Sequence, residues 1–269
     1  MAATFTLSAF GDEIADDLAE QLDLLAEEGV HHLELRGVWG KNVLDLSAAE
    51  LRQARAMLDE RGFGVSAIAS PIGKSRLDQP RSFELERLER ATIAAAVLGT
   101  EKIRIFSFYY AGPPESVRDE VLFRMAQLTE RAERSGLTLV HENEKDIYGD
   151  LPSRCQDMIS SIGSPALRMA FDPANFVQCG VQPFSDAWPL LADLTTHVHI
   201  KDAVFSDGSV RPAGQGDGAI AELLADLNKR DYIGFLTLEP HLKVAGHSSG
   251  FSGADGMRLA IHALRGLLS

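Results

Sequence analysis

The segment Leu137–Glu144 reads LTLVHENE, and it joins an apolar run directly to a cluster of ionisable side chains. A short apolar run of this kind is typical of a strand that is buried on both faces. Such a strand ends in charged groups for one of two reasons: the chain reaches water there, or the strand carries functional groups into a site. The other strands of the sequence decide between these explanations.

Seven further segments share this apolar, strand-like character. With the first they give eight expected strands, at Phe5–Phe10, His32–Arg36, Val65–Ser70, Ile103–Phe108, Leu137–Glu142, Arg168–Asp172, Thr196–Ile200 and Phe235–Glu239. Between them, apolar residues recur at three- and four-residue spacing, which predicts helices. The clearest helical segment runs from Ile14 to Gly29. Another begins at Ser47, where Glu50 completes a capping box, and ends at Gly62.

The alternation of eight strands with eight helices predicts parallel strands joined by right-handed crossovers. Dividing 269 residues by eight gives about 34 residues per strand–helix unit, which suits a (β/α)8 barrel. An open doubly wound sheet is the alternative, but no glycine-rich G-x-G-x-x-G turn follows the first expected strand. The sequence therefore favours an α/β fold with a single (β/α)8 TIM barrel domain over residues 1–269.

The composition limits the kinds of partner. The net charge is −13, from 26 basic and 39 acidic residues. That balance disfavours nucleic-acid and membrane-surface binding, because both need a positive field. Cys155 and Cys179 form neither a disulfide scaffold nor a metal-type Cys-x-x-Cys pair, and we expect no signal peptide and no membrane span. We therefore expect a cytoplasmic protein with a small-molecule substrate, and the sequence leaves a homo-oligomer open.

Metal-binding side chains stand at the ends of the last four expected strands. Glu142, Asp172 and Glu239 end three of them, and His199 lies near the end of the fourth. The carboxyl ends of barrel strands meet at one rim, where barrel enzymes hold their active sites. Any one of these residues alone would also suit a solvated strand end, a turn or a hydrogen-bonded core histidine.

The four residues together predict a metal site. Three carboxylates that converge with an imidazole would repel one another unless a cation neutralised them. Three oxygen ligands and one nitrogen favour one divalent ion, with Mn²⁺ first and Mg²⁺, Co²⁺ and Zn²⁺ as alternatives. Four protein ligands leave coordination positions for substrate or water, as in a catalytic site.

The runs VHENE, FDPANF, HVHIKD, GQGDG and TLEPH resemble those of xylose isomerase-like TIM barrels, in particular the sugar phosphate isomerase/epimerase family. The resemblance covers nearly the whole chain. It implies that Glu142, Asp172, His199 and Glu239 hold one divalent metal, and that the two glutamates form the acid/base pair. Of the two histidines in HVH it selects the second, so we expect His197 to lie deeper in the barrel.

The resemblance implies an isomerase or epimerase that moves a proton through a metal-bound enediolate of a ketose, keto-sugar or sugar acid. A lyase or dehydratase acting on a cyclitol or a 3-oxo-glycoside would use the same metal and base, and the sequence does not separate the two. An apurinic endonuclease of this fold would need further histidines, which the strand ends ASPIGK and FSFYY do not supply. A non-catalytic sugar-binding or partner barrel would not need all four ligands.

Five further residues are expected to contact the carbohydrate: Glu34, Trp39, Asn175, Lys201 and Arg211. Asn175 stands where epimerases of the resembling family often carry a histidine. Lys201 has pairing with Asp202 as its alternative role. Glu34 shares a strand face with Arg36, so a buried ion pair between them is the alternative there.

Three other features carry weaker expectations. Asp217 is expected to cap the seventh helix, which begins near Ala219. His141 alternates away from Glu142 and is expected to support the site from outside the barrel. The Gly- and Ser-rich loop His241–Gly253 is expected to serve as a lid or a subunit contact.

Overall fold

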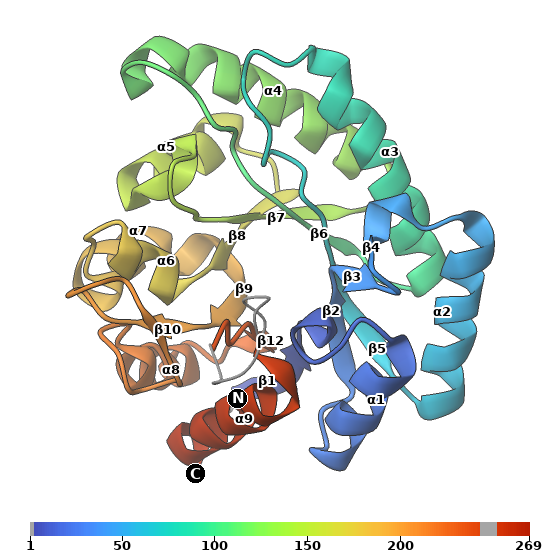
Figure 1. The fold of residues 1–269 in the computed structure, drawn as a ribbon. Coiled ribbons are helices and arrows are strands. Elements are labelled where there is room, and N and C mark those ends of the chain that lie inside the picture. The colour runs from blue at the N-terminus through green and yellow to red at the C-terminus, as the bar shows by residue number, and fades with distance from the viewer. Residues whose placement is uncertain (1–2, 243–251) are drawn as a thin grey trace.

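The computed structural model describes residues 3–242 and 252–269, and its strands form a closed parallel barrel (Figure 1). Around the barrel lie β1 (Thr4–Ala9), β2 (His32–Leu35), β5 (Gly64–Ala69), β6 (Lys102–Ile105), β7 (Thr138–Glu142), β8 (Leu167–Phe171), β9 (Thr195–Ile200) and β12 (Ile233–Leu238). The first and last of these strands pair over six residues and close the barrel. The predicted (β/α)8 fold is confirmed, and each predicted strand has its counterpart.

Helices surround the barrel: α1 (Leu18–Glu27), α2 (Ala48–Arg61), α3 (Arg81–Leu98), α4 (Pro114–Arg134), α5 (Pro152–Ile162), α6 (Pro173–Gln178), α7 (Trp188–Leu191), α8 (Ile220–Lys229) and α9 (Gly253–Leu268). Two short antiparallel strand pairs lie outside the barrel sheet. One is formed by β3 (Gly37–Val38) and β4 (Lys41–Asn42), and the other by β10 (Asp202–Ala203) and β11 (Val210–Arg211). The connection from β8 to β9 contains the two short helices α6 and α7 where a single helix was expected.

Local capping explains where two of the helices begin. The Ser47 side chain accepts from the Glu50 N–H, and Glu50 accepts from the Ser47 N–H, so the predicted capping box at α2 is confirmed. The prediction that a helix begins at Ile14 is wrong. Helix α1 begins at Leu18, because the Asp17 carboxylate accepts from the backbone N–H groups of the first turn and fixes the start there.

The glycine-rich segment before α8 is organised by a buried aspartate. Asp202 accepts backbone N–H groups from Gly214, Gly216 and Gly218 at 2.8–3.0 Å. A Cβ on Gly216 would approach the Asp202 carboxylate to 2.4 Å, so a side chain there would displace the carboxylate. Glycine at this position therefore allows the loop backbone to close around the buried charge.

Asp217 does not have the capping role that we expected. Its Oδ2 accepts from the Phe205 N–H at 2.7 Å, and the N-cap of α8 is Ala219, which makes no side-chain capping bond. The expectation was wrong because the chain turns through a left-handed residue at Ala219 before the helix begins. Asp217 therefore ties the loop to the segment after β10.

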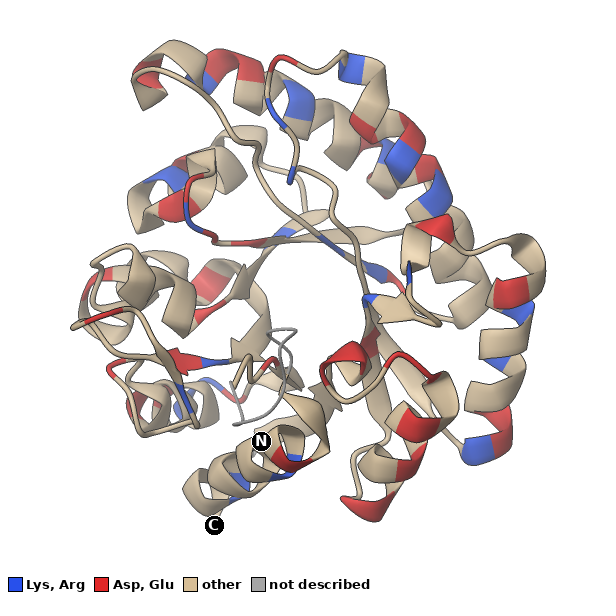
Figure 2. Cartoon of the chain, in the orientation of Figure 1, with Lys and Arg blue, Asp and Glu red and all other residues tan. Residues whose placement is uncertain are grey.

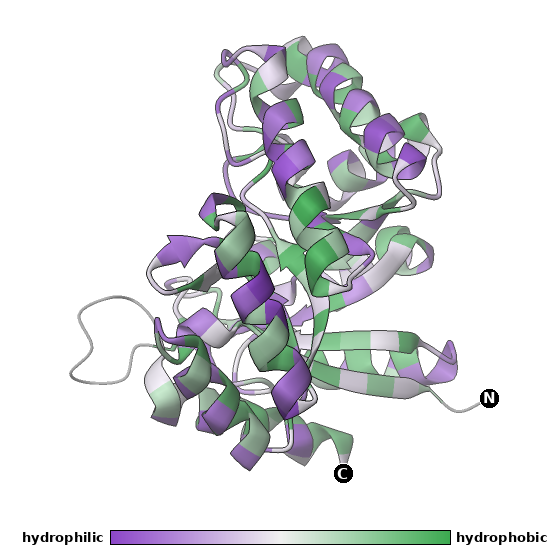
Figure 3. Cartoon of the chain, turned by 90° about the vertical axis from the view of Figure 1, so that its right-hand side faces the viewer, coloured by the Kyte–Doolittle hydropathy of each residue, from purple (hydrophilic) through white to green (hydrophobic). Residues whose placement is uncertain are grey.

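The outer helices carry residues of both charges and a mixture of polar and apolar side chains. Basic and acidic residues are interspersed along the outer helices α2, α3 and α4 (Figure 2). Purple and green alternate along the same helices in Figure 3, as expected for helices with one face on the core and one in water. Within residues 3–242 and 252–269, no helix is both long enough and apolar enough to cross a bilayer.

Candidate metal centre

Glu142, Asp172, His199 and Glu239 converge at the carboxyl ends of β7, β8, β9 and β12. Each offers one ligand atom, and these four atoms lie within 4.8 Å of one another. All four side chains are buried. Strand pleating aims them inward, because alternate residues of each strand face the barrel interior. The structure therefore brings together the four residues that the strand ends predicted.

The donor atoms of this cluster fit a divalent cation. His199 Nδ1 lies 3.5 Å from Glu142 Oε1 and 3.9 Å from both Asp172 Oδ2 and Glu239 Oε2. Among the described residues it has no hydrogen-bond partner. A buried nitrogen that lacks a hydrogen bond and faces three carboxylates forms a polar centre that a shared cation would complete.

The buried Arg104 and the partly buried Arg36 hold the two glutamates of the cluster. Arg104 Nη1 lies 3.1 Å from Glu142 Oε2, and Arg36 Nη1 lies 2.9 Å from Glu239 Oε1. Arg104 was not among the predicted site residues, although the run KIRI places it between isoleucines on a barrel strand, where a charged residue needs a partner. The arginines direct one oxygen of each glutamate away from the centre and fix both side chains.

These cations set the protonation state of the two glutamates. Burial raises the pKa of Glu142, but His199 and Arg104 outweigh it and lower that pKa to about 2. Burial likewise raises the pKa of Glu239, while Lys201 and other nearby cations bring it well below its usual range. Both glutamates are therefore ionised at neutral pH, as a metal ligand or a general base must be.

The other two members of the cluster have raised pKa values. Burial raises the pKa of Asp172 to about 6, against the opposing attraction of Lys201. Burial lowers the pKa of His199, but Glu34 and Glu142 outweigh it and raise that pKa well above its ordinary value. A cation entering the cluster would therefore compete with protons at both residues.

Lys201 contacts the cluster directly. Its Nζ lies 2.8 Å from Asp172 Oδ2 and 3.1 Å from Glu239 Oε2, and the side chain is buried. The alternative that Lys201 pairs with Asp202 is wrong, because the Asp202 carboxylate is turned into the glycine-rich loop. A substrate contact by Lys201 stays a prediction.

Asn175 supports one of the glutamates. Its Nδ2 donates to Glu142 Oε1 at 3.1 Å and to the carbonyl oxygen of Asn143 at 2.8 Å. The Asp172 side chain caps α6 by accepting from the Asn175 N–H at 2.9 Å. Asn175 is thus fixed between two expected ligands, and its contact with substrate stays a prediction.

Glu34 and Arg36 do not pair with each other, so that alternative is wrong. Arg36 instead contacts Asp12 at 2.7 Å and Glu13 at 2.8 Å, in addition to its contact with Glu239. Glu34 lies beneath the cluster, where it contacts two histidines. Neighbouring positions on one strand face took different partners because each side chain reaches a different layer of the barrel.

Arg211 and Trp39 lie farther out. Arg211 is exposed on β11 and, with His241, lines a cavity of about 440 Å³. His241 Nε2 lies 3.0 Å from Glu239 Oε1, so this cavity adjoins the cluster. Trp39 is partly buried against the core in the β3–β4 hairpin. The substrate roles of Arg211 and Trp39 stay predictions.

A separate hollow of about 490 Å³ lies between α3 and α4, and none of the predicted site residues line it.

Two weaker expectations have different outcomes. The outward orientation of His141 is confirmed. Its Nε2 lies 3.0 Å from Ser107 Oγ, on the face of β7 opposite to the one that carries Glu142. Most of the loop expected to act as a lid, residues 243–251, lies outside the described residues.

Residues 22–265 match the sequence profile of the xylose isomerase-like TIM barrel. The chain belongs to the xylose isomerase-like TIM barrel family. This confirms the resemblance seen in the strand-end motifs.

Two curated relatives of this family member are epimerases. The chain is 28% identical over 222 residues to the 2-epi-5-epi-valiolone 7-phosphate 2-epimerase of Actinoplanes sp., which covers 80% of this chain and 78% of that protein. It is 26% identical over 134 residues to the fructoselysine 3-epimerase of Escherichia coli O157:H7, which covers 48% of each. These relatives support the expectation of an isomerase or epimerase enzyme.

Solved structures share the fold at low sequence identity. The probable 3-DHS dehydratase AsbF of Bacillus anthracis superposes with a TM-score of 0.76 at 16% identity, over 97% of this chain and 99% of that chain. The IOLI protein with a binding zinc atom gives 0.77 at 12%, over 98% of both chains. A xylose isomerase-like protein of Mycobacterium smegmatis in complex with magnesium gives 0.71 at 17%, over 100% of both chains.

Proposed function

We propose that the chain is a divalent-metal-dependent epimerase or isomerase of a ketose, keto-sugar or sugar acid, acting in the cytoplasm by proton abstraction next to a carbonyl group. The observation that carries this proposal is the cluster of Glu142, Asp172, His199 and Glu239, whose ligand atoms lie within 4.8 Å of one another. The named epimerases among its relatives support the substrate class.

These four residues would hold the ion. A bound divalent cation would stabilise the negative charge that develops on the sugar oxygens when a neighbouring C–H bond is broken. The ligand set favours Mn²⁺, with Mg²⁺, Co²⁺ and Zn²⁺ as alternatives. The zinc and magnesium in the two structural relatives show that proteins of this fold hold such ions.

Glu142 and Glu239 are the proposed acid/base pair. Both have lowered pKa values, so each begins the reaction as a carboxylate that can accept a proton. One would remove the proton from the substrate carbon. The other would first have to take up a proton from water, which it would then give to the opposite face of that carbon. The arginines at 3.1 and 2.9 Å keep each carboxylate in a fixed orientation during that exchange.

The proposal is tested by metal content and by hydrogen exchange. Elemental analysis would compare wild type, Glu142→Gln/Glu239→Gln and a matched control, Glu84→Gln, whose carboxyl is buried on α3 and bonded to the Gly73 N–H. We expect about one divalent ion per chain in wild type and in the control, and loss in the double variant. Absence of any bound metal from wild type after loading would overturn the proposal.

Keto-sugars incubated in D₂O with the metal-loaded protein distinguish the reaction types. Deuterium at the carbon next to the carbonyl, with inverted configuration, would support an epimerase, and a carbonyl shifted along the chain an isomerase. Loss of water from a cyclitol or a 3-oxo-glycoside would support the lyase or dehydratase alternative.

A further inference from the structure

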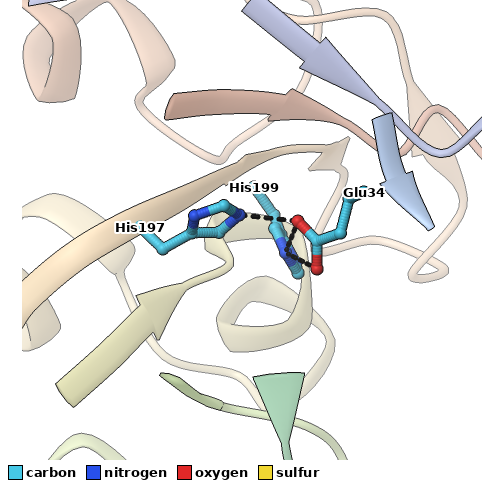
Figure 4. Close-up of side chains that lie close together, drawn as sticks. All are labelled: Glu34, His197 and His199. Carbon is cyan, nitrogen blue, oxygen red and sulfur yellow. Dashed lines mark hydrogen bonds and ion pairs between the residues drawn. The ribbon is translucent and has the colours of Figure 1, made fainter. Parts of the chain in front are cut away.

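A second polar cluster lies directly beneath the proposed metal ligands. Glu34 on β2 faces His197 and His199 on β9 (Figure 4). Glu34 Oε2 lies 2.6 Å from His197 Nε2, and His199 Nε2 lies 3.3 Å from both oxygens of Glu34. The side chains are fully buried, so water does not compete for these bonds.

The protons of this cluster can be assigned from its chemistry. Glu34 Oε2 lies within hydrogen-bond distance of Nε2 of both histidines, and a carboxylate can only accept such bonds. Each histidine must therefore donate through Nε2. Once His199 is neutral, as metal binding requires, the proton on Nε2 leaves a lone pair on Nδ1. Nδ1 is the nitrogen that faces Glu142, Asp172 and Glu239.

We infer that Glu34 is a positioning residue of the proposed metal centre, which fixes the proton of His199 on Nε2 and leaves Nδ1 as the metal-binding atom. This inference rests on the proposed function. A carboxylate behind a ligating imidazole orients the ring and raises its basicity. Glu34 thus acts through His199, in place of the substrate contact expected from its strand end.

His197 fixes Glu34 in turn. Its Nε2 faces both Glu34 Oε2 and the Thr237 hydroxyl, which lies 3.0 Å away on the neighbouring strand β12. The short bond to Glu34 places the carboxylate where it also reaches His199. Hydrogen bonds therefore join the three side chains into a chain that supports His199 from the barrel interior.

A second metal ion is the alternative occupant of this cluster, because Glu34, His197 and His199 offer three donor atoms. The geometry favours hydrogen bonding. The 2.6 Å separation of His197 Nε2 and Glu34 Oε2 is that of a strong hydrogen bond. His199 would also have to lose both ring protons to bind one ion at each nitrogen.

The first test is which nitrogen of His199 binds the metal. Wild-type protein with ¹⁵N-labelled histidine would be loaded with Zn²⁺, and long-range ¹⁵N–¹H correlation spectra would assign the protonated nitrogen. We expect a metal-bound Nδ1 and an exchange-protected proton on Nε2. Metal binding through Nε2 would overturn the inference, and this measurement needs no variant.

The second test is metal affinity, measured by titration calorimetry with Mn²⁺ and with Zn²⁺. Glu34→Gln retains the shape of the side chain but has one acceptor oxygen for two N–H donors. We expect its dissociation constant to rise by about 10- to 100-fold, while the buried control Glu84→Gln binds as wild type does. Equal affinities of the two variants would overturn the positioning role.

The outcomes separate the inference from the proposed function. If wild type binds no divalent ion, the proposed function fails. If wild type binds one ion and Glu34→Gln binds as tightly, only the positioning role fails. Two ions in wild type, one of which is lost in Glu34→Gln, would make Glu34 a ligand and overturn the positioning role.

Discussion

Arg36 connects three carboxylates at the site. Its guanidinium contacts Asp12, Glu13 and Glu239, and burial leaves 19% of the side chain exposed. Replacing it by Met would leave these carboxylates without that partner. We expect the free energy of unfolding of metal-free Arg36→Met to fall by about 3 kcal/mol, measured by urea denaturation.

Arg118 provides the matched control, because it contacts Asp157 through two nitrogens on the surface with 39% of its side chain exposed. Exposed ion pairs contribute little, so we expect Arg118→Met to lose at most about 1 kcal/mol. Similar losses in the two variants would show that burial of Arg36 does not decide its contribution.

His141 makes a separate prediction about acid stability. Burial lowers its pKa to about 3, against the weaker attraction of Glu142. The unfolded side chain titrates near its ordinary value of about 6.5. Below that pH the unfolded chain binds a proton that the folded chain excludes, so stability is complete above about 6.5 and falls as the pH drops toward 3.

The measurement compares urea unfolding of wild type and His141→Gln at pH 7.0 and pH 4.5. At about 1.4 kcal/mol per pKa unit, we expect wild type to lose roughly 2.5 kcal/mol more than the variant over this interval. The other titrating groups are common to both proteins and cancel in the comparison. Parallel losses would contradict a buried neutral His141.

The sequence predicted the side chains that gather at the barrel rim better than it predicted their contacts. Glu142, Asp172 and Glu239 could be found because each stands at or just beyond the end of a parallel strand, and barrel geometry brings such ends to one rim. Arg104 and Glu34 could not be assigned, because their partners are on other strands. Which side chains meet across a barrel depends on strand register and depth, and one strand's sequence encodes neither.

At the scale of elements, the loop before α8 depends on Asp202. Its Oδ1 accepts from Gly218, and its Oδ2 accepts from Gly214 and Gly216. In Asp202→Asn, one side of the side chain becomes an NH₂ group that faces N–H donors. Bonds to a charged group contribute about 1.5 kcal/mol or more, so we expect amide exchange at the affected glycines to accelerate at least about tenfold.

Asp207→Asn is the control for this loop, since Asp207 lies in an exposed turn and accepts from the Ser209 N–H and hydroxyl. Mass-spectrometric hydrogen exchange over residues 208–218 would compare the two variants. Unchanged exchange in Asp202→Asn would show that the loop holds its conformation without the buried charge.

The two ends of helix α2 were predicted correctly, because residues at those ends determine them. The capping box at Ser47 and the left-handed Gly62, with a φ of 71°, could be read directly from residue types. The helices of the connection after β8 could not be predicted in this way. Pro183 and Pro189 interrupt the helical pattern there, and the chain forms α6, a π-helical turn and α7. Its path is set by packing against the barrel, which short segments do not encode.

At the scale of the whole molecule, the proposed metal would join four strands, β7, β8, β9 and β12. An ion that binds only the folded chain stabilises it by mass action, by about 2.7 kcal/mol at a free concentration 100 times the dissociation constant. We therefore expect added Mn²⁺ to raise the melting temperature and EDTA to reverse the change. Calorimetry of Glu142→Gln/Glu239→Gln should show no such shift, and an equal shift there would place the ion elsewhere.

The pairing of β1 with β12 has a consequence for biosynthesis. These strands match from Thr4 with Ile233 to Ala9 with Leu238, so more than two hundred residues separate the partners. Until β12 has left the ribosome and joined the barrel, the sheet has two unpaired edges, at β1 and β9, and lacks Glu239. Until β12 pairs with both, these edges are exposed to wrong pairing, and the proposed metal site lacks one of its four ligands.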